Sequence, residues 1–475
     1  MNVSFLQELL NTVAEQSRAL LPKALFGAGA EDNVEALARA LMSGRGEASG
    51  VAIARQLINR LKVASSEERK AFYTFLADEL QPDAKAVADA ASSYLEGPSE
   101  QSLSALQQAT ESPRREFFRR LNLAQGATAE IVAMRHELLR QGSSDPVAAA
   151  LDGDLQYLLQ TWFNRGFLVL RRIDWQTPAA ILEKIIAYEA VHEIKGWDDL
   201  RRRLDPHDRR CFAFFHPALV DEPLIFVEVA LMSSIPGAIA PVLEARHGAA
   251  DDEPTTAVFY SISNCQEGLK GISFGNFLLK QVVEELVKEL PTLKTFVTLS
   301  PVPHFARWLD RALANAGADN VTDDDRARLK VLRDPRWVEM ANQRGSQSTQ
   351  VHDSLMALAA DYFLTARSRD NRPVDPVARF HLGNGARLER INWLADTSEK
   401  GLREAHGLMV NYRYDLTEIE KNHEAYAQDG TVAASRAVRG LLRPPAKPKM
   451  RAVAQEILPP PVRPTQKKLR GGTAP

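Results

Sequence analysis

The pattern of apolar residues changes near residue 163, and this change restricts the folds open to the chain. Before it, apolar residues recur every three or four positions, as at Leu57 and Leu61, which is the spacing of an amphipathic helix. After it, short runs rich in β-branched and aromatic residues alternate with helical segments. We therefore predict an α+β, mixed fold, with a helical bundle over residues 1–158 and a mixed-sheet domain over 159–443. No strict period repeats, so a solenoid is not expected.

Two helix-start signals support the helical interpretation of the first region. Ser65 and Glu68 have the spacing of a capping box, in which each side chain accepts from the other residue's backbone N–H. Ser112 followed by Pro113 matches an N-cap with proline at the first helical position. The region holds no pattern of catalytic residues, so we expect it to pack, cap or oligomerise.

The second region contains the signals of a mixed sheet. Residues 211–215 and 224–231 are β-rich runs separated by a turn-rich segment, which predicts an antiparallel pair. A further run at 257–263 leads through a glycine-bearing loop into a helix over 278–290, and another strand follows at 295–299. This order predicts a strand–loop–helix–strand unit with parallel strands.

Residues 444–475 have a different composition. They hold eight prolines and seven Lys or Arg residues against one acid, Glu456. Such a segment buries too little apolar surface to offset its ordering entropy. We expect a disordered tail, with solvation favoured over contact with an anionic surface.

Composition excludes several classes of function. Lys+Arg total 59 and Asp+Glu total 61, so a nucleic-acid partner is not expected. No run of about 18 apolar residues predicts insertion into a membrane. Two cysteines, Cys211 and Cys265, exclude a disulfide scaffold and indicate a reducing compartment such as the cytoplasm. No CxxC, HExxH or histidine spacing predicts a metal site.

The glycine-bearing loop is the first candidate site. Gly268, Gly271 and Gly275 allow the backbone to approach a ligand closely, and the following helix begins at Asn276 with free N–H groups suited to a phosphate. The spacing is neither that of a P-loop nor that of a dinucleotide fingerprint. A flexible strand-to-helix turn is the structural alternative.

Ser300 and His381 are the other candidates. Ser300 follows a strand and precedes Pro301, which ends the ladder, so its hydroxyl is expected at the strand's carboxyl edge. His381 stands beside a Gly-Asn-Gly turn and is suited to proton transfer near neutral pH. A hydroxyl satisfied by a local turn and a structural histidine are the alternatives.

Six blocks, in family order over most of residues 160–416, resemble the malonyl-CoA decarboxylase family. The blocks are HPALVDEPLIFVEVALM (216–232), FYSIS (259–263), GLKGISFGNFLLKQVVEEL (268–286), LSPVPHFARWL (299–309), FHLGNGARLERINWLAD (380–396) and GLMVNYRYDL (407–416). The resemblance implies a GNAT-like acyltransferase fold and a helical N-terminal domain used in oligomerisation, commonly a tetramer. It implies that Ser300 and His381 are catalytic. Coenzyme A would be bound by the loop residues Lys270, Gly271, Ile272, Ser273, Phe274, Gly275 and Asn276.

The sequence departs from animal members of the family at two places. His304 follows SPVP where a glycine is usual, and the peroxisomal C-terminal Ser-Lys-Leu is absent. The second difference, together with an N-terminus unlike a transit peptide, favours a bacterial cytoplasmic enzyme.

The chemistry of the implied reaction agrees with these residue types. Loss of CO₂ from a malonyl thioester leaves an enolate, which needs hydrogen-bond donors and one proton but no cofactor beyond the coenzyme A of the substrate. His381 is expected to give the proton, and Asn384 or Tyr414 to complete the enolate site. The alternative is an acyl-CoA-dependent N-acetyltransferase of the same fold. A third reading, a non-catalytic interaction protein, predicts no binding of coenzyme A.

Overall fold

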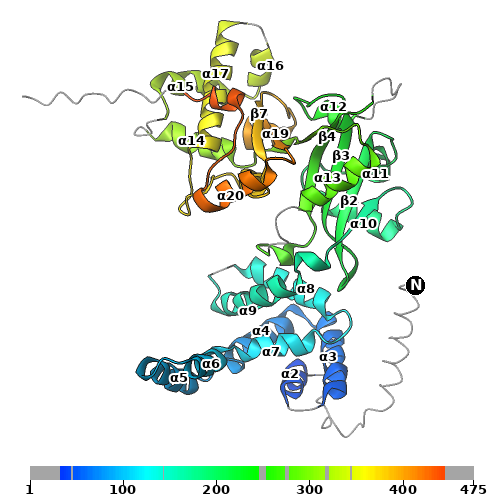
Figure 1. Ribbon diagram of the computed structural model, residues 1–475, viewed down its shortest axis with the longest axis vertical. Helices are drawn as coiled ribbons and strands as arrows, with labels where there is room; N and C mark the ends of the chain where they lie inside the picture. Colours follow the sequence, from blue (N-terminus) through cyan, green and yellow to red (C-terminus); the bar gives the residue numbers. More distant parts are fainter. Residues whose placement is uncertain are drawn as a thin grey trace, which may run out of the picture.

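A helical region is followed by a mixed-sheet domain, which confirms the expected fold class (Figure 1). The computed structural model describes residues 33–43, 46–142, 144–244, 253–272, 278–315, 320–342 and 345–443. The segment 444–475, expected to be a disordered tail, lies outside the described residues.

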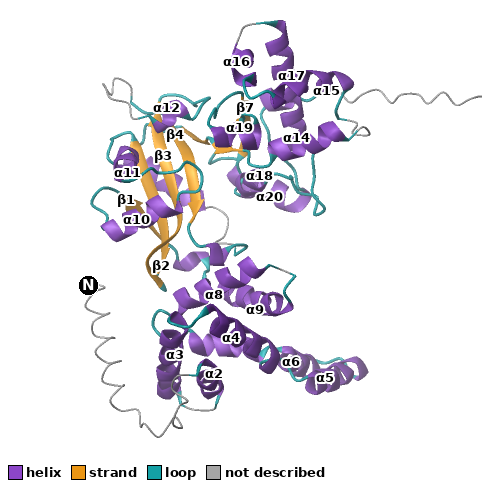
Figure 2. Cartoon of the chain, turned by 180° about the vertical axis from the view of Figure 1, so that it is seen from behind, coloured by secondary structure: helices purple, strands orange, loops and turns teal. Residues whose placement is uncertain are grey.

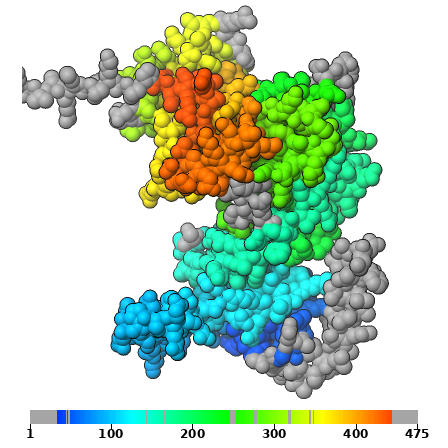
Figure 3. All heavy atoms as spheres, viewed as in Figure 1, coloured from blue at the N-terminus to red at the C-terminus, as the bar shows by residue number. Residues whose placement is uncertain are grey.

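The helical region confirms both helix-start signals. Ser65 and Glu68 form a capping box at the start of α4, and Ser112 is the N-cap of α7 with Pro113 at its first position. Helices α5 and α6 have no buried residue and project from the region as an arm (Figure 3). The helices are α2 (Val34–Met42), α3 (Glu47–Lys62), α4 (Ser66–Glu79), α5 (Ala84–Glu96), α6 (Glu100–Thr110), α7 (Pro113–Leu121), α8 (Ala127–Gln141) and α9 (Pro146–Trp162).

The sheet is mixed, as predicted (Figure 2). Its order is β1-β2-β3-β4-β5-β8-β6, and β7 also pairs with β8. β2 and β3 are antiparallel, whereas β4 and β5 are parallel, which confirms the expected strand–loop–helix–strand unit. The strands are β1 (Val169–Ile173), β2 (Arg209–His216), β3 (Leu219–Met232), β4 (Thr256–Asn264), β5 (Thr295–Thr298), β6 (Ser300–Pro301), β7 (Arg387–Asn392) and β8 (Met409–Tyr414).

Helices cover both faces of the sheet. α10 (Ala179–Tyr188) and α11 (Trp197–Leu204) pack on one face, and α13 (Leu278–Glu289) packs on the other. β2 alternates between these two cores and is buried along its whole length. The remaining helices are α12 (Ala240–Leu243), α14 (Phe305–Ala314), α15 (Asp323–Arg328), α16 (Trp337–Asn342), α17 (Ser346–Leu364), α18 (Pro376–Gly383), α19 (Glu399–Ala405), α20 (Ile419–Asp429) and α21 (Arg436–Arg439), and the short 3₁₀ turns are η3 (Arg165–Phe167), η4 (Glu267–Leu269) and η5 (Leu329–Arg333).

The two parallel strands end at different heights in the sheet. Their pairing runs from Thr256 opposite Thr295 to Phe259 opposite Thr298, where β5 ends. β4 continues to Asn264, a further rise of about 16 Å at the usual spacing in a strand. The glycine turn therefore begins well beyond the level of Ser300, although both follow carboxyl ends of neighbouring strands.

None of the described helices is both long and apolar enough to cross a membrane.

Candidate active site

The fold brings Ser300 and His381 into direct contact. The distance from Ser300 Oγ to His381 Nε2 is 3.0 Å, although 81 positions separate the two residues. Ser300 is 5% exposed and His381 is 2% exposed. A hydroxyl and an imidazole in such contact, shielded from water, form a unit that can hold and move a proton.

Ser300 is held by the residue two positions before it. β5 ends at Thr298 and β6 begins at Ser300, so the two side chains lie on the same face of an almost continuous strand. Ser300 Oγ donates to Thr298 Oγ1 at 2.8 Å. Thr298 Oγ1 also accepts from the backbone N–H of Tyr412 at 3.1 Å, which connects the hydroxyl pair to β8.

His381 lies in the last turn of helix α18 rather than in the loop that follows it. Asp375 is the N-cap of this helix, and its carboxylate accepts from the Ala378 backbone N–H at 2.8 Å and from the Tyr362 hydroxyl at 3.1 Å. Burial raises the pKa of Asp375 to about 6. This buried N-cap fixes the start of the helix and so the position of the imidazole.

Two tyrosines of β8 surround the imidazole. The Tyr414 hydroxyl is 2.8 Å from His381 Nδ1, and the Tyr412 ring is stacked on the imidazole with centroids 4.5 Å apart. Because Ser300 donates to Thr298, its oxygen accepts from His381, and Nε2 carries the ring proton. Nδ1 then accepts from the Tyr414 hydroxyl, and this network assigns the tautomer.

Burial determines the charge of the imidazole. It lowers the pKa of His381 to about 3 and raises the pKa of Tyr414 well above its usual value. His381 is therefore neutral at pH 7 and offers an N–H to a group next to Ser300. The described residues include no group of three or more His, Cys, Asp or Glu side chains arranged to hold a metal ion.

We expect the burial of His381 and His192 to lower the free energy of unfolding as pH falls from about 6.5 toward 4, while the raised pKa values of Asp375 and Glu228 act in the opposite direction. Burial lowers the pKa of His381 to about 3 and that of His192 to about 4, so below pH 6.5 these two histidines bind more protons in the unfolded chain than in the folded chain. Each such histidine costs up to about 1.4 kcal/mol per pH unit in this window. Urea unfolding at pH 7.5 and 5.5 measures the loss. In the His381→Asn variant the contribution of His381 to this pH dependence should be absent. The same pH dependence in the variant and the wild type would contradict the buried, neutral state of His381.

A cavity of about 540 Å³ lies between the glycine turn and α18. Lys270, Gly271 and Ile272 line one side of it, and Phe380 and Asn384 line the other. Arg372, Arg379 and His423 also line the cavity, so its wall carries several groups suited to phosphate. Ser300 and His381 are buried and are not in the lining, whereas Phe380, one position before His381, and Asn384, three positions after it, are.

The candidate residues from the sequence thus fall into two places. Ser300, His381 and Tyr414 meet, whereas Lys270–Ile272 and Asn384 line the cavity, and Asn384 Nδ2 donates to the Phe380 carbonyl at 2.7 Å. The expected binding residues Ser273, Phe274, Gly275 and Asn276 lie outside the described residues.

The sequence matches one family in both regions. Residues 166–452 match the malonyl-CoA decarboxylase C-terminal domain, and residues 80–163 match the malonyl-CoA decarboxylase N-terminal domain. The chain belongs to the malonyl-CoA decarboxylase family. Its members are carboxy-lyases, so the enzyme class expected from the six sequence blocks is confirmed.

Solved structures and curated relatives agree with this assignment. Malonyl-CoA decarboxylase from Rhodopseudomonas palustris is 51% identical, with a TM-score of 0.81 over 86% of this chain and 99% of that chain. The protein from Agrobacterium vitis is 54% identical, also with a TM-score of 0.81, over 86% of this chain and 100% of that chain. The mitochondrial malonyl-CoA decarboxylase of Anser anser anser is 37% identical over 69% of each chain.

Thr298 and Tyr412 were not singled out from the sequence as neighbours of Ser300 and His381. A signal for both was present, because side chains two positions apart in a strand share a face. Thr298 shares a face with Ser300, and Tyr412 shares one with Tyr414. Which of these pairs faces the histidine depends on how β8 pairs with β5 and β6, and that pairing joins distant segments.

Proposed function

We propose that this chain converts malonyl-CoA to acetyl-CoA and CO₂ with Ser300 and His381 as its catalytic pair. The observation that carries the proposal is the buried 3.0 Å contact between Ser300 Oγ and His381 Nε2 in a member of this family. In the reaction, the bond between the carboxylate carbon and C2 breaks, and its electrons move into the thioester carbonyl as an enolate. A proton then reaches C2.

His381 supplies that proton. Its neutral ring presents the N–H of Nε2, and an enolate carbon is basic enough to take that proton. The negative charge passes from the enolate to the ring, and the imidazolate regains a proton from water before the next turnover. The same N–H stabilises the developing enolate charge before the transfer, in a site where burial strengthens the interaction. Ser300 orients the substrate carboxylate and the imidazole, or takes part in proton exchange with it.

Coenzyme A is bound by Lys270, Gly271, Ile272, Ser273, Phe274, Gly275 and Asn276. The cavity between the glycine turn and α18 supports this assignment, because its basic lining suits phosphate groups. Gly271 has a φ of +79°, a conformation that glycine adopts without strain. Asn384 lines the other side of the cavity and, with Tyr414, completes the enolate site in this proposal.

We further propose a homotetramer in the bacterial cytoplasm, with boundaries at residues 158 and 443. The unburied arm of α5 and α6 offers a surface for assembly. Cys211 and Cys265 are both free and buried, which suits a reducing compartment. The last helix of the first region ends at Trp162 and the first strand begins at Val169, so the change of structure lies close to the proposed boundary.

Incubation with malonyl-CoA alone tests the proposed function. The decarboxylase releases acetyl-CoA and CO₂ in equal amounts without any acceptor amine. An N-acetyltransferase of the same fold would hold the thioester until an amine is added. Absence of acetyl-CoA from malonyl-CoA alone, with product formed only after addition of an amine, would contradict the proposal.

Replacing Tyr414 with phenylalanine should lower kcat by about tenfold and leave KM for malonyl-CoA nearly unchanged. The hydroxyl donates to His381 Nδ1, so its loss frees the ring to adopt the other tautomer, in which Nε2 has no proton to give. Tyr412→Phe keeps the ring that stacks on the imidazole and serves as the control. Equal kcat values for the two variants would remove Tyr414 from the proton-transfer unit.

A further inference from the structure

A buried arginine of the helical region holds the backbone of the glycine turn. Arg135 in α8 is 2% exposed, and its guanidinium donates to the carbonyl oxygens of Gly268 at 2.7 Å and Lys270 at 2.8 Å. Its Nε donates to Asp152 of α9 at 2.7 Å, which fixes the direction of the guanidinium. The charged donor therefore joins two helices of the first region to the start of the proposed coenzyme A loop.

The hydrogen bonds of the turn show what Arg135 contributes. The turn's own backbone N–H groups donate to the carbonyls of residues 266, 267 and 269. Arg135 donates to the carbonyl oxygens of residues 268 and 270, which lie on either side of residue 269 in the chain. Hydrogen bonds from a charged donor are stronger than neutral ones, so this contact fixes the turn more firmly than local backbone bonds alone.

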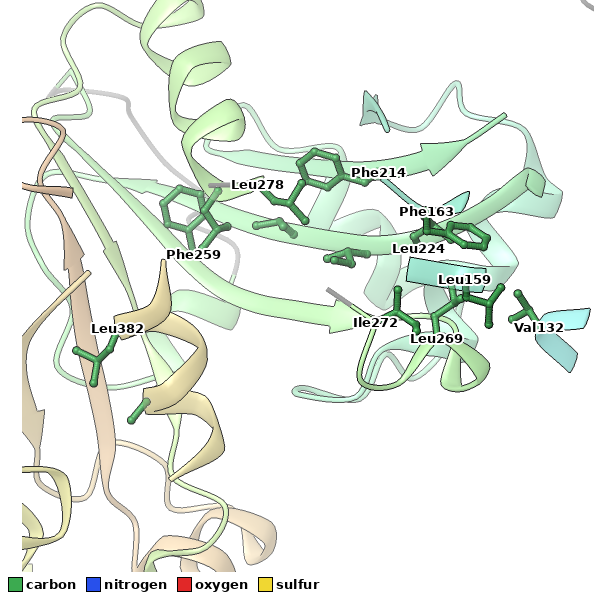
Figure 4. Close-up of a cluster of buried hydrophobic side chains, with 14 of the residues drawn as sticks. Val132, Leu159, Phe163, Phe214, Leu224, Phe259, Leu269, Ile272, Leu278 and Leu382 are labelled. Carbon is green, nitrogen blue, oxygen red and sulfur yellow. The ribbon is translucent and has the colours of Figure 1, made fainter. Parts of the chain in front are cut away.

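The fit between α8 and the turn is also tight. A Cβ on Gly268 would lie 2.0 Å from the carbonyl oxygen of Val132 in α8, so a side chain at this position would displace the turn. Beside this contact, Leu269 and Ile272 are buried in the same apolar cluster as Val132 and Leu159, and Figure 4 shows these four side chains side by side. The turn thus rests on the helical region by backbone contact, hydrogen bonds and apolar packing together.

We propose that Arg135 is a positioning residue for coenzyme A binding and that the helical region therefore sets substrate affinity. This inference rests on the proposed assignment of the loop 270–276 to coenzyme A. Arg135 has no contact with the reactive pair. Its loss should raise KM and the Kd for coenzyme A, and should leave kcat at saturating malonyl-CoA almost unchanged.

The test compares Arg135→Met with Arg69→Met in the full chain. Arg69 is the control, because its side chain is only 13% exposed and it pairs with Glu130 and Glu137 of the same helix α8. Both variants should lower Tm. Only Arg135→Met should weaken the binding of coenzyme A, by about tenfold, and raise KM by a similar factor. Calorimetric titration with coenzyme A and steady-state assays give these values, and size-exclusion elution checks that assembly is unchanged.

Gly275→Val, which places a branched side chain in the loop itself, separates failure of this inference from failure of the proposed site. If Gly275→Val weakens coenzyme A binding and Arg135→Met behaves like Arg69→Met, the positioning role is wrong and the site stands. If Gly275→Val folds and binds coenzyme A normally, the assignment of the loop to coenzyme A is wrong. The positioning role of Arg135 is then wrong as well, because it depends on that assignment.

A second variant decides the matter if Arg135→Met does not fold. Gly268→Ala leaves Arg135 in place and pushes the turn away from Val132. It should weaken coenzyme A binding by about tenfold and accelerate amide hydrogen exchange at residues 267–272, with kcat almost unchanged. A folded Gly268→Ala protein with unchanged affinity and unchanged exchange would overturn the inference.

Discussion

Replacing His381 with alanine should lower kcat by about 10²–10⁴-fold, the usual effect of removing a positioned proton donor. The imidazole is held on three sides, by Ser300 at Nε2, Tyr414 at Nδ1 and the Tyr412 ring against its face, so no neighbouring group can take its place by a small shift. The affinity for coenzyme A should stay nearly unchanged, because the cavity that we assign to the cofactor portion of the substrate is not lined by His381.

Two other histidines provide controls for this experiment. His216 is buried against the Phe163 ring, with centroids 4.7 Å apart, and His304 is an exposed residue at the start of α14. Alanine at either position should leave kcat within about twofold of the wild type. Acetyl-CoA release under saturating malonyl-CoA is the measurement. A near-normal kcat for His381→Ala would show that another group donates the proton, and these two histidines would then become the candidates.

The sequence predicted the separate parts of the fold because their signals are local. Capping residues and the period of apolar positions act within a few residues, and the structure agrees with both. The expectation that Pro301 ends the ladder was wrong, because Pro301 lies in β6 and is paired with Met409 of β8. The pairing of Ser300 with His381 is not local. It came from the resemblance of the sequence blocks, since nothing in the spacing of residues 81 positions apart places their side chains 3.0 Å from each other.

The separation of the glycine turn from the reactive pair was not predictable from spacing. Two parallel neighbouring strands place their carboxyl ends at one edge, which suggests that the residues after them meet. Here β5 ends opposite Phe259, whereas β4 continues to Asn264. The glycine turn after β4 therefore lies beyond the level of Ser300 and contacts α8. The length of β4 beyond its partner depends on its pairing with β3, and Arg135 lies more than a hundred positions away from the turn in the chain.

The double replacement of Ser300 and His381 should lower kcat little more than His381→Ala alone. Ser300→Ala should itself cost about 10²-fold or more, because the serine hydroxyl accepts from Nε2 and connects the imidazole to Thr298. In one hydrogen-bonded catalytic unit, the Ser300 hydroxyl contributes to kcat only through His381. Its removal therefore has little further effect once His381 is absent, and the two effects on kcat are strongly non-additive.

Independent roles predict a different result for the same cycle. If Ser300 only held the substrate carboxylate and His381 only gave the proton, the two losses in kcat would multiply, and the double variant would fall by about 10⁴-fold or more. Thr298→Val, which keeps the shape of the side chain and removes the hydroxyl that Ser300 donates to, distinguishes the two cases further. A single unit predicts a lower kcat for Thr298→Val in the wild-type background and almost no added effect in the His381→Ala background, whereas equal losses in both backgrounds would show that Ser300 and His381 act separately.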